Sequence, residues 1–161
     1  MGGCLRTSAS IATRRTSAER VADALDTNVL AYLVSADEVK ADIAARLLRD
    51  GDIVIGVQVL NELVNVLRRK AKLDWPEIER FVESVKRLCA VTPLTVAIHD
   101  EGRRLAARYR LSTGDALICA AAIDAGAARL YSEDMQHGLE IDGVLQILDP
   151  FRDLSDPSNR A

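Results

Sequence analysis

Two hydrophobic patterns alternate along the chain and predict strands that alternate with helices. Short apolar runs next to turn-forming residues, which are typical of buried strands, lie at 21–25, 53–57, 128–131 and 144–148. Apolar residues at helical spacing lie at 29–34, 36–50, 59–69, 75–88, 99–110 and 115–125. Residues 91–96, interrupted by Pro93, predict only a weak strand or an extended link.

This order of elements predicts an α/β fold with a mostly parallel sheet, because strands joined through helices run in the same direction. A length of 161 residues suits a single domain. The residues are 48% hydrophobic but only 4% aromatic, so we expect a core of Ala, Val, Leu and Ile. The segment 115–125 is apolar on nearly all sides and should be the most buried helix.

The first predicted strand ends at an acid, Asp26, which is followed by Thr27 and Asn28. Ligands usually bind at the carboxyl ends of the strands of a parallel sheet, so an acid at this place is a candidate for chemistry. Asp is also a favoured helix N-cap, and for a single acid at a strand-to-helix turn capping is the commoner role.

Two further acids lie within predicted helices. Glu62 falls at the edge of an apolar stripe, where a carboxylate is costly unless it is paired or coordinated. Asp115 opens the most apolar helix, and Ser112 forms a capping-box pattern with it, which explains Asp115 structurally without excluding a ligand role. Asp74 and Glu77 form a similar pattern beside an early proline, and we interpret that pair as structural.

A fourth acid repeats the placement of Asp26. Asp134 follows the apolar strand at 128–131, with Ser132 between them, so it too should lie at the carboxyl edge of the sheet. Right-handed crossovers bring successive strand ends to one edge, and Asp26, Glu62, Asp115 and Asp134 could therefore converge.

Convergence of four carboxylates has a chemical consequence. Two bare carboxylates about 4 Å apart repel by roughly 4 kcal/mol at an effective dielectric near 20, so four of them need protons or cations among them. Oxygen ligands without His or Cys favour Mg²⁺ or Mn²⁺ over zinc. Such a site polarises a phosphate and activates water, which is the chemistry of phosphodiester hydrolysis.

Charge gives a weaker indication. The net charge of −3 argues against binding nucleic acid by bulk electrostatics, but basic residues are concentrated in the middle of the chain. They are Arg68, Arg69, Lys70, Lys72, Arg80, Lys86, Arg87, Arg103, Arg104, Arg108 and Arg110. These residues could hold phosphates at the rim of an acidic centre, or they could simply be the solvated faces of helices.

The remaining features exclude several classes of protein. No apolar run approaches the roughly 18 residues that cross a bilayer, and the first residues lack a signal-peptide core, so we expect a soluble cytoplasmic protein without membrane contact. Cys4, Cys89 and Cys119 are odd in number and far apart, which indicates neither a disulfide framework nor a thiolate zinc site. His99 and His137 are too isolated for a zinc cluster or a catalytic triad.

Four short motifs carry a resemblance to a known family. They are 26–30 (DTNVL), 61–63 (NEL), 112–118 (STGDALI) and 131–134 (YSED). In this order and spacing they resemble the motifs of PIN-domain ribonucleases, in particular VapC-like toxins of type II toxin–antitoxin systems. The resemblance covers residues 21–151. Members of the family usually reach the first Asp within a few residues of Met1, and we expect residues 1–20 to be a disordered extension and 152–161 a loose tail.

The resemblance implies a single-domain three-layer α/β/α sandwich. It also implies that Asp26, Glu62, Asp115 and Asp134 bind the metal, with Thr27 and Ser132 orienting them through hydroxyl hydrogen bonds. Members cleave RNA with Mg²⁺ or Mn²⁺, often form homodimers, and are inhibited by a small antitoxin whose tail enters the acidic groove.

Two other functions compete with this interpretation. The same fold could bind RNA or an antitoxin without efficient turnover, which would make the protein a binding module. An aspartyl phosphatase of the haloacid type would also place a nucleophilic Asp at the end of the first strand, but it needs a second Asp two residues later, where this chain has Asn28.

Overall fold

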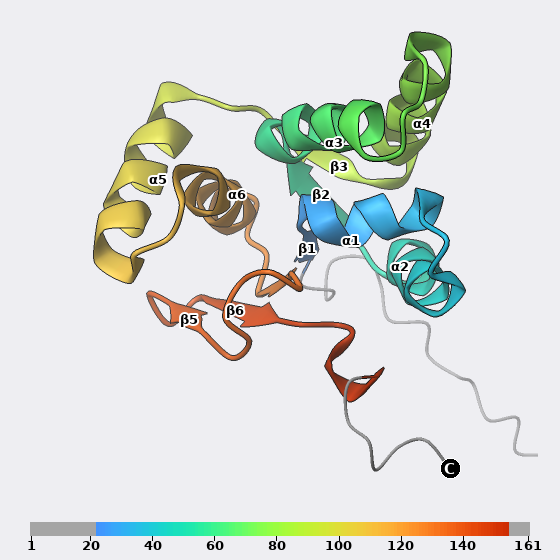
Figure 1. The fold of residues 1–161 in the computed structure, drawn as a ribbon. Coiled ribbons are helices and arrows are strands. Elements are labelled where there is room, and N and C mark those ends of the chain that lie inside the picture. Colours follow the sequence, from blue (N-terminus) through green and yellow to red (C-terminus); the bar gives the residue numbers. More distant parts are fainter. Residues whose placement is uncertain (1–21, 155–161) are drawn as a thin grey trace, which may run out of the picture.

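The computed structural model describes residues 22–154 and contains one six-stranded sheet (Figure 1). The strands are β1 (Asp23–Leu25), β2 (Ile53–Gly56), β3 (Ala90–Thr92), β4 (Arg129–Tyr131), β5 (Glu140–Ile141) and β6 (Leu145–Leu148). They lie in the order β3-β2-β1-β4-β6-β5. All neighbouring pairs are parallel except β5 and β6, which confirms the mostly parallel sheet.

Helices cover both faces of the sheet, as Figure 1 shows with α5 and α6 on one side and α1 to α4 on the other. They are α1 (Thr27–Ala31), the 3₁₀ turn η2 (Tyr32–Val34), α2 (Glu38–Asp50), α3 (Val57–Arg69), α4 (Trp75–Leu88), α5 (Val96–Tyr109) and α6 (Thr113–Asp124). The strand order explains the two layers. Right-handed crossovers from β1 to β2 to β3 move one way along the sheet, and the return to β4 puts α5 and α6 on the opposite face.

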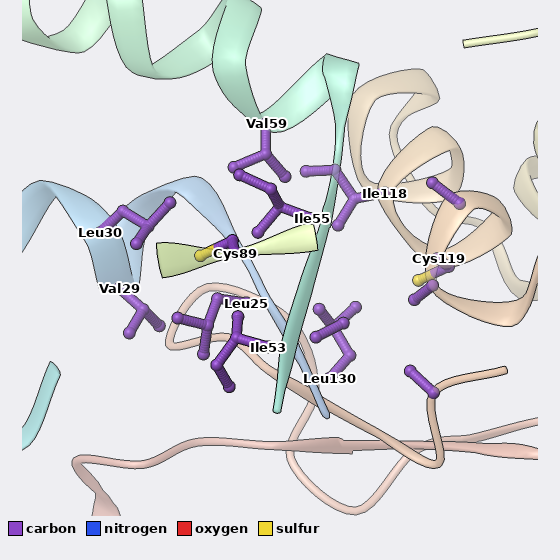
Figure 2. Close-up of a cluster of buried hydrophobic side chains, with 14 of the residues drawn as sticks. Leu25, Val29, Leu30, Ile53, Ile55, Val59, Cys89, Ile118, Cys119 and Leu130 are labelled. Carbon is purple, nitrogen blue, oxygen red and sulfur yellow. The ribbon is translucent and has the colours of Figure 1, made fainter. Parts of the chain in front are cut away.

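The core lies between these layers and consists largely of small and branched aliphatic residues. In Figure 2, Leu30 of α1 and Ile118 of α6 lie on opposite sides of β1 and β2, and Cys89 lies among the apolar side chains. Seven residues of α6 are buried, which confirms it as the most buried helix. Burial raises the pKa of Cys89 to about 11 and that of Cys119 to about 12, so both thiols are inert core groups.

Gly56 brings α6 close to β2. A Cβ atom at Gly56 would lie 2.7 Å from the Cβ of Ala121, so any larger side chain would push the helix away from the strand. The close approach matters for the carboxyl edge of the sheet, because α6 begins there with Asp115 in its first turn.

The structure differs from the sequence prediction at several boundaries. Strand β5 was not predicted, because two residues are too short to show a period. Helix α5 begins at Val96 and not at His99, since the Thr95 hydroxyl accepts a hydrogen bond from the Ile98 N–H and caps the helix. The predicted capping box of Asp74 and Glu77 is present.

The two chain ends lie partly beyond what the structure describes. Arg152–Leu154 form a short 3₁₀ helix, where the sequence predicted the start of a loose tail. The predicted extension at 1–20 and the rest of the predicted tail lie outside the described residues. Within residues 22–154, no helix combines the length and apolarity needed to cross a bilayer.

Candidate active site at the carboxyl edge of the sheet

Two neighbouring strands, β1 and β4, end side by side and each leads into a polar turn. Leu25 pairs with Tyr131 at the ends of the strands, and the Asp26 N–H donates to the Tyr131 carbonyl at 2.9 Å. The next residues, Asp26 after β1 and Ser132 after β4, therefore face each other although they are 106 positions apart. This is the edge where the sheet reverses its direction of winding, a usual place for a ligand site.

Asp26 is the most enclosed acid of this edge. The residue is 4% exposed, and its carboxylate accepts hydrogen bonds from the Thr27 N–H at 2.6 Å, the Asn28 amide at 2.9 Å and the Ser132 hydroxyl at 2.7 Å. The residue is also the N-cap of α1, so the capping role expected for it is present. A cap needs one hydrogen bond, whereas Asp26 is held by donors from both sides of the cleft.

Burial raises the pKa of Asp26 from 3.8 to about 6. The hydrogen bonds from Ser132 and Thr27 oppose this rise, while the negative charges of Asp115 and Glu62 add to it. The ionised form is thus disfavoured chiefly by loss of water around it and further by neighbouring carboxylates. A cation bound nearby would favour the ionised carboxylate and so lower the pKa of Asp26.

Glu62 reaches the same place from α3. Its Oε1 accepts from the Gln58 amide at 2.8 Å and its Oε2 from the Thr27 hydroxyl at 3.3 Å. At Gly114, in the first turn of α6, a Cβ atom would lie 2.7 Å from Glu62 Oε1. Glycine at this position therefore allows the Glu62 carboxylate to lie against the start of α6.

Asp115 and Asp134 complete the group with different degrees of enclosure. The Asp115 N–H donates to the Ser112 hydroxyl at 3.1 Å, which caps α6, and the Asp115 side chain lines the cavity. Asp134 lies in the turn after β4 and is exposed, so it does not share the buried environment of Asp26. One cavity of about 570 Å³ is lined by all four acids.

A family model for the PIN domain matches residues 24–138 of the chain, which is more than two thirds of its length. The chain belongs to the PIN-domain family. The matched region contains all four acids and ends in the turn that follows Asp134. No curated protein sequence matches the chain.

Solved structures with the same fold include toxins and toxin–antitoxin complexes. The chain is similar to VapC20 of Mycobacterium tuberculosis, described as a toxin that cleaves the sarcin–ricin loop, with 18% identity, a TM-score of 0.59, and coverage of 70% of this chain and 90% of that one. It is similar to a toxin–antitoxin complex from Klebsiella pneumoniae, with 18% identity, a TM-score of 0.61 and coverage of 80% and 98%. It is also similar to VapBC-1 of nontypeable Haemophilus influenzae, with 19% identity, a TM-score of 0.59, and coverage of 81% of this chain and 98% of that one. At these identities the likeness establishes the three-layer PIN fold.

The chemistry of the cavity suits a hard divalent cation. The side chains that line the cavity include five carboxylates and one ammonium group but neither His nor Cys. Among residues 22–154, no three Asp, Glu, His or Cys side chains are grouped so that they could hold one metal ion. The donors of this PIN domain's cavity are thus oxygen atoms, the type that a hard divalent cation binds.

The fifth carboxylate of the cavity, Glu133, was not singled out by the sequence. It forms an ion pair with Lys40, at the start of α2, and accepts a hydrogen bond from the Tyr32 hydroxyl. Burial disfavours the Glu133 charge, but the hydrogen bonds from Lys40 and Tyr32 outweigh burial and lower its pKa. Tyr32 also packs edge-on against the buried Phe151, with 4.9 Å between the ring centroids. Among the five acids that line the cavity, Glu133 is thus the one whose charge is balanced by an ion pair.

Asn28 is a second polar residue of the site that sequence reasoning did not assign. Besides donating to Asp26, its amide donates to the Ser132 hydroxyl at 3.3 Å and accepts from the Glu133 N–H at 3.3 Å. It therefore joins the turn after β1 to the turn after β4. The sequence signals were its place two residues after Asp26, which is also a common position for a turn-forming residue, and its inclusion in the motif at 26–30.

The basic residues in the middle of the chain differ in whether they lie near the acidic cavity. Arg103, Arg104 and Arg108 belong to α5, on the other side of the sheet from α3, and pair with nearby acids. Lys70, at the end of α3, lines the acidic cavity. Of the eleven basic residues named from the sequence, Lys70 alone is among the residues that line the cavity, so a basic rim that holds phosphates stays a prediction. The α5 residues are part of a paired helix surface.

Proposed function

We propose that this protein is a metal-dependent endoribonuclease that hydrolyses RNA phosphodiester bonds and acts as the toxin of a toxin–antitoxin pair. The observation that carries the proposal is the convergence of Asp26, Glu62, Asp115 and Asp134, from four separate segments, on one cavity at the carboxyl edge of the sheet. Membership of the PIN-domain family supports it, and the toxin structures that share the fold are consistent with it.

In this proposal the four acids hold Mg²⁺ or Mn²⁺, and Thr27 and Ser132 orient them. Asp26 is positioned by three donors, so its oxygens are directed before any substrate arrives. Glu62 is positioned by Gln58 and by the Thr27 hydroxyl. Asp115 and Asp134 are less constrained and can adjust to the cation. A bound divalent ion would polarise the phosphate and lower the pKa of a water molecule.

The raised pKa of Asp26 fits this role. A carboxylate that is costly to ionise in the free protein gains more from a cation than an exposed one does, because cation binding removes its electrostatic penalty. Metal binding should therefore release part of a proton near pH 6 and weaken as the pH falls below that value.

The test is cleavage of RNA by the purified full chain with Mn²⁺. The variants Asp26→Asn and Asp115→Asn should each lower the cleavage rate on the order of 100-fold or more, because each removes a proposed ligand without changing the size of the side chain. Asp124→Asn is the matched control, since Asp124 is exposed at the far end of α6 and should leave the rate unchanged. Equal rates for all four proteins would contradict the proposed site.

Multiple-turnover kinetics separate an enzyme from the alternative, a PIN-fold module that binds RNA or an antitoxin without efficient turnover. With RNA in large excess, the enzyme should convert many substrate molecules per protein. A binding module would leave the excess intact while still retaining labelled RNA on the protein.

An antitoxin partner and a homodimer belong to the same proposal. Complexes described as toxin–antitoxin pairs share the fold, and the cavity could admit a peptide tail as well as a substrate. Exposed apolar side chains at Leu88, Val91, Leu94 and Val96 lie close together in the chain and are candidates for contacts between copies. Light scattering of the purified chain measures its oligomeric state. We place the protein in the cytoplasm in this proposal, because a ribonuclease toxin must reach cellular RNA.

A further inference from the structure

The acidic cavity extends from the sheet edge along a groove between two helical walls, which we call the α1–α3 groove. One wall is α3, on which Glu62, Val66 and Lys70 recur every four residues and line the cavity. The other wall is formed by α1, η2 and the turn after them, where Ala31 and Val34 line the cavity. The groove therefore has carboxylates at one end, an apolar middle and Lys70 at the other end.

Lys70 is an available cation. It is exposed, and within residues 22–154 its ammonium group takes part in no ion pair. It lies eight residues beyond Glu62 on the same face of α3, which is about 12 Å along the helix axis. Lys40, in contrast, is occupied by Glu133. The positive charge in the groove thus lies at a defined separation from the acids.

The size and lining of the groove favour one strand of a nucleic acid over a duplex. A volume of about 570 Å³ is that of a pocket for a small molecule, so part of a single strand can enter but a double helix cannot. A strand alternates charged phosphates with uncharged sugars and bases. The groove shows the same alternation, because an apolar section separates the two ionic ends.

We propose that the α1–α3 groove holds a single strand of RNA, with the Lys70 ammonium group binding a phosphate beyond the one that lies at the four acids. This inference rests on the proposed ribonuclease function and specifies the path of its substrate. The strand would leave the acids along Val66 and reach Lys70 at the end of α3. An acidic peptide is the competing occupant, and the experiment tests it directly.

The experiment measures binding without cleavage. Fluorescence anisotropy of a labelled single-stranded RNA oligonucleotide is followed in EDTA with the full-length Asp26→Asn protein, over a range of salt concentrations. Adding Lys70→Gln should weaken binding about fivefold at 0.1 M salt and reduce the slope of log K against log salt by about 0.7, the value for one phosphate contact on a single strand.

Lys86→Gln is the matched control, because it removes the same charge from an exposed position on α4, where Lys86 pairs with Glu83. This variant should keep the salt slope of the parent. An equal effect of Lys70→Gln and Lys86→Gln, or no effect of either, would overturn the proposal. Binding of an oligo-aspartate peptide that depends on Lys70, with RNA binding unchanged, would overturn it in favour of a protein occupant.

Kinetics on the active protein supply a second measurement. Lys70→Gln should raise KM for a short single-stranded substrate about fivefold and leave kcat nearly unchanged, since the lost contact is the same in the ground and transition states. If no variant cleaves RNA but binding still depends on Lys70, the ribonuclease proposal fails while the assignment of the groove stands. If cleavage occurs and neither KM nor the salt slope depends on Lys70, only the groove assignment fails.

Discussion

Asp26 and Asp142 are both aspartates that accept several hydrogen bonds, yet their pKa values move in opposite directions. Burial raises the pKa of Asp26 to about 6, whereas the hydrogen bond from Arg104 lowers the pKa of Asp142. Asp142 lies in the β5–β6 turn and accepts from the Tyr109 hydroxyl at 2.8 Å, with Arg108 also close by. The donors of Asp26 are neutral, whereas those of Asp142 include cations.

The difference shows which acids the fold leaves available for a ligand. Around α5 each carboxylate has a nearby guanidinium group, so its charge is already balanced. At the carboxyl edge, Glu133 is balanced by Lys40, whereas Asp26 and Glu62 have hydroxyl, amide and backbone donors in place of cations. Within residues 22–154, neither Asp115 nor Asp134 takes part in an ion pair. An unbalanced charge in a cavity costs stability and is characteristic of a functional site.

Among the variants that test the contrast between Asp26 and Asp142, Asp26→Asn in the metal-free protein should show the largest change in stability. A folded-state pKa raised from 3.8 to about 6 means that protonated Asp26 favours folding below about pH 4, and this contribution is lost as the pH rises through about 6. The loss is on the order of 3 kcal/mol at pH 8. Asn cannot ionise, so the variant should be the more stable protein at pH 8, by up to roughly 6 to 12 °C in Tm.

Thermal unfolding in EDTA at several pH values checks this result. The difference in Tm between variant and parent should grow from pH 4 to pH 7 and then level off. Excess Mn²⁺ should reduce the difference by stabilising the parent alone, because a ligand stabilises the state that binds it. A variant that is less stable than the parent at pH 8 would show that the hydrogen bonds of Asp26 outweigh its burial.

A smaller effect should follow from Gly114→Ala, which changes the acidic cavity without changing any charge. The added methyl group would meet Glu62 Oε1, the end of a flexible side chain, so the carboxylate should shift and the fold should remain. We expect RNA cleavage to fall about tenfold, equivalent to about 1.4 kcal/mol, with little change in Tm. Gly126→Ala is a useful contrast, since Gly126 has open space around it but a φ of +74°, and should lower Tm without lowering the cleavage rate.

The smallest effect should come from Asp142→Asn. Asn tolerates the φ of 50° at this position, so the variant loses only the charge that faces Arg104 and Arg108. A lowered pKa contributes stability above the ordinary pKa of Asp and loses it as the pH falls through the lowered value, so the variant should be slightly less stable at pH 7 but not near pH 2. Denaturant unfolding measures this, and unchanged RNA cleavage would distinguish Asp142 from Asp26.

The elements of the fold were largely predictable, because their signals are local. The run at 53–57 predicted β2 to within one residue, and the apolar period predicted α3 and α6. The sequence did not predict one strand that is very short, and it misplaced the start of one helix. Strand β5 has only two residues. Helix α5 begins at Val96 after its cap Thr95, within the segment that Pro93 interrupts and for which the sequence predicted a weak strand or an extended link.

The candidate site was predictable in part for the same reason. Asp26 and Asp134 follow strands, and Asp115 opens a helix, so a parallel sheet places all of them near one edge. The sequence did not reveal that Glu133 is neutralised while its neighbour Asp134 is exposed. That difference depends on Lys40, 93 positions away, which no local pattern connects to Glu133.

The sequence by itself determined the order of strands and helices, the parallel sheet and the acids at the ends of its elements, because these follow from the spacing of residues along a few turns of chain. Only the tertiary structure decided how deeply Asp26 is buried, which carboxylates acquire a cation, and that Lys70 shares a groove with the acids. Burial and charge pairing depend on contacts between segments distant in the chain, and each alters the energy of an ionised group by an amount that local sequence does not encode.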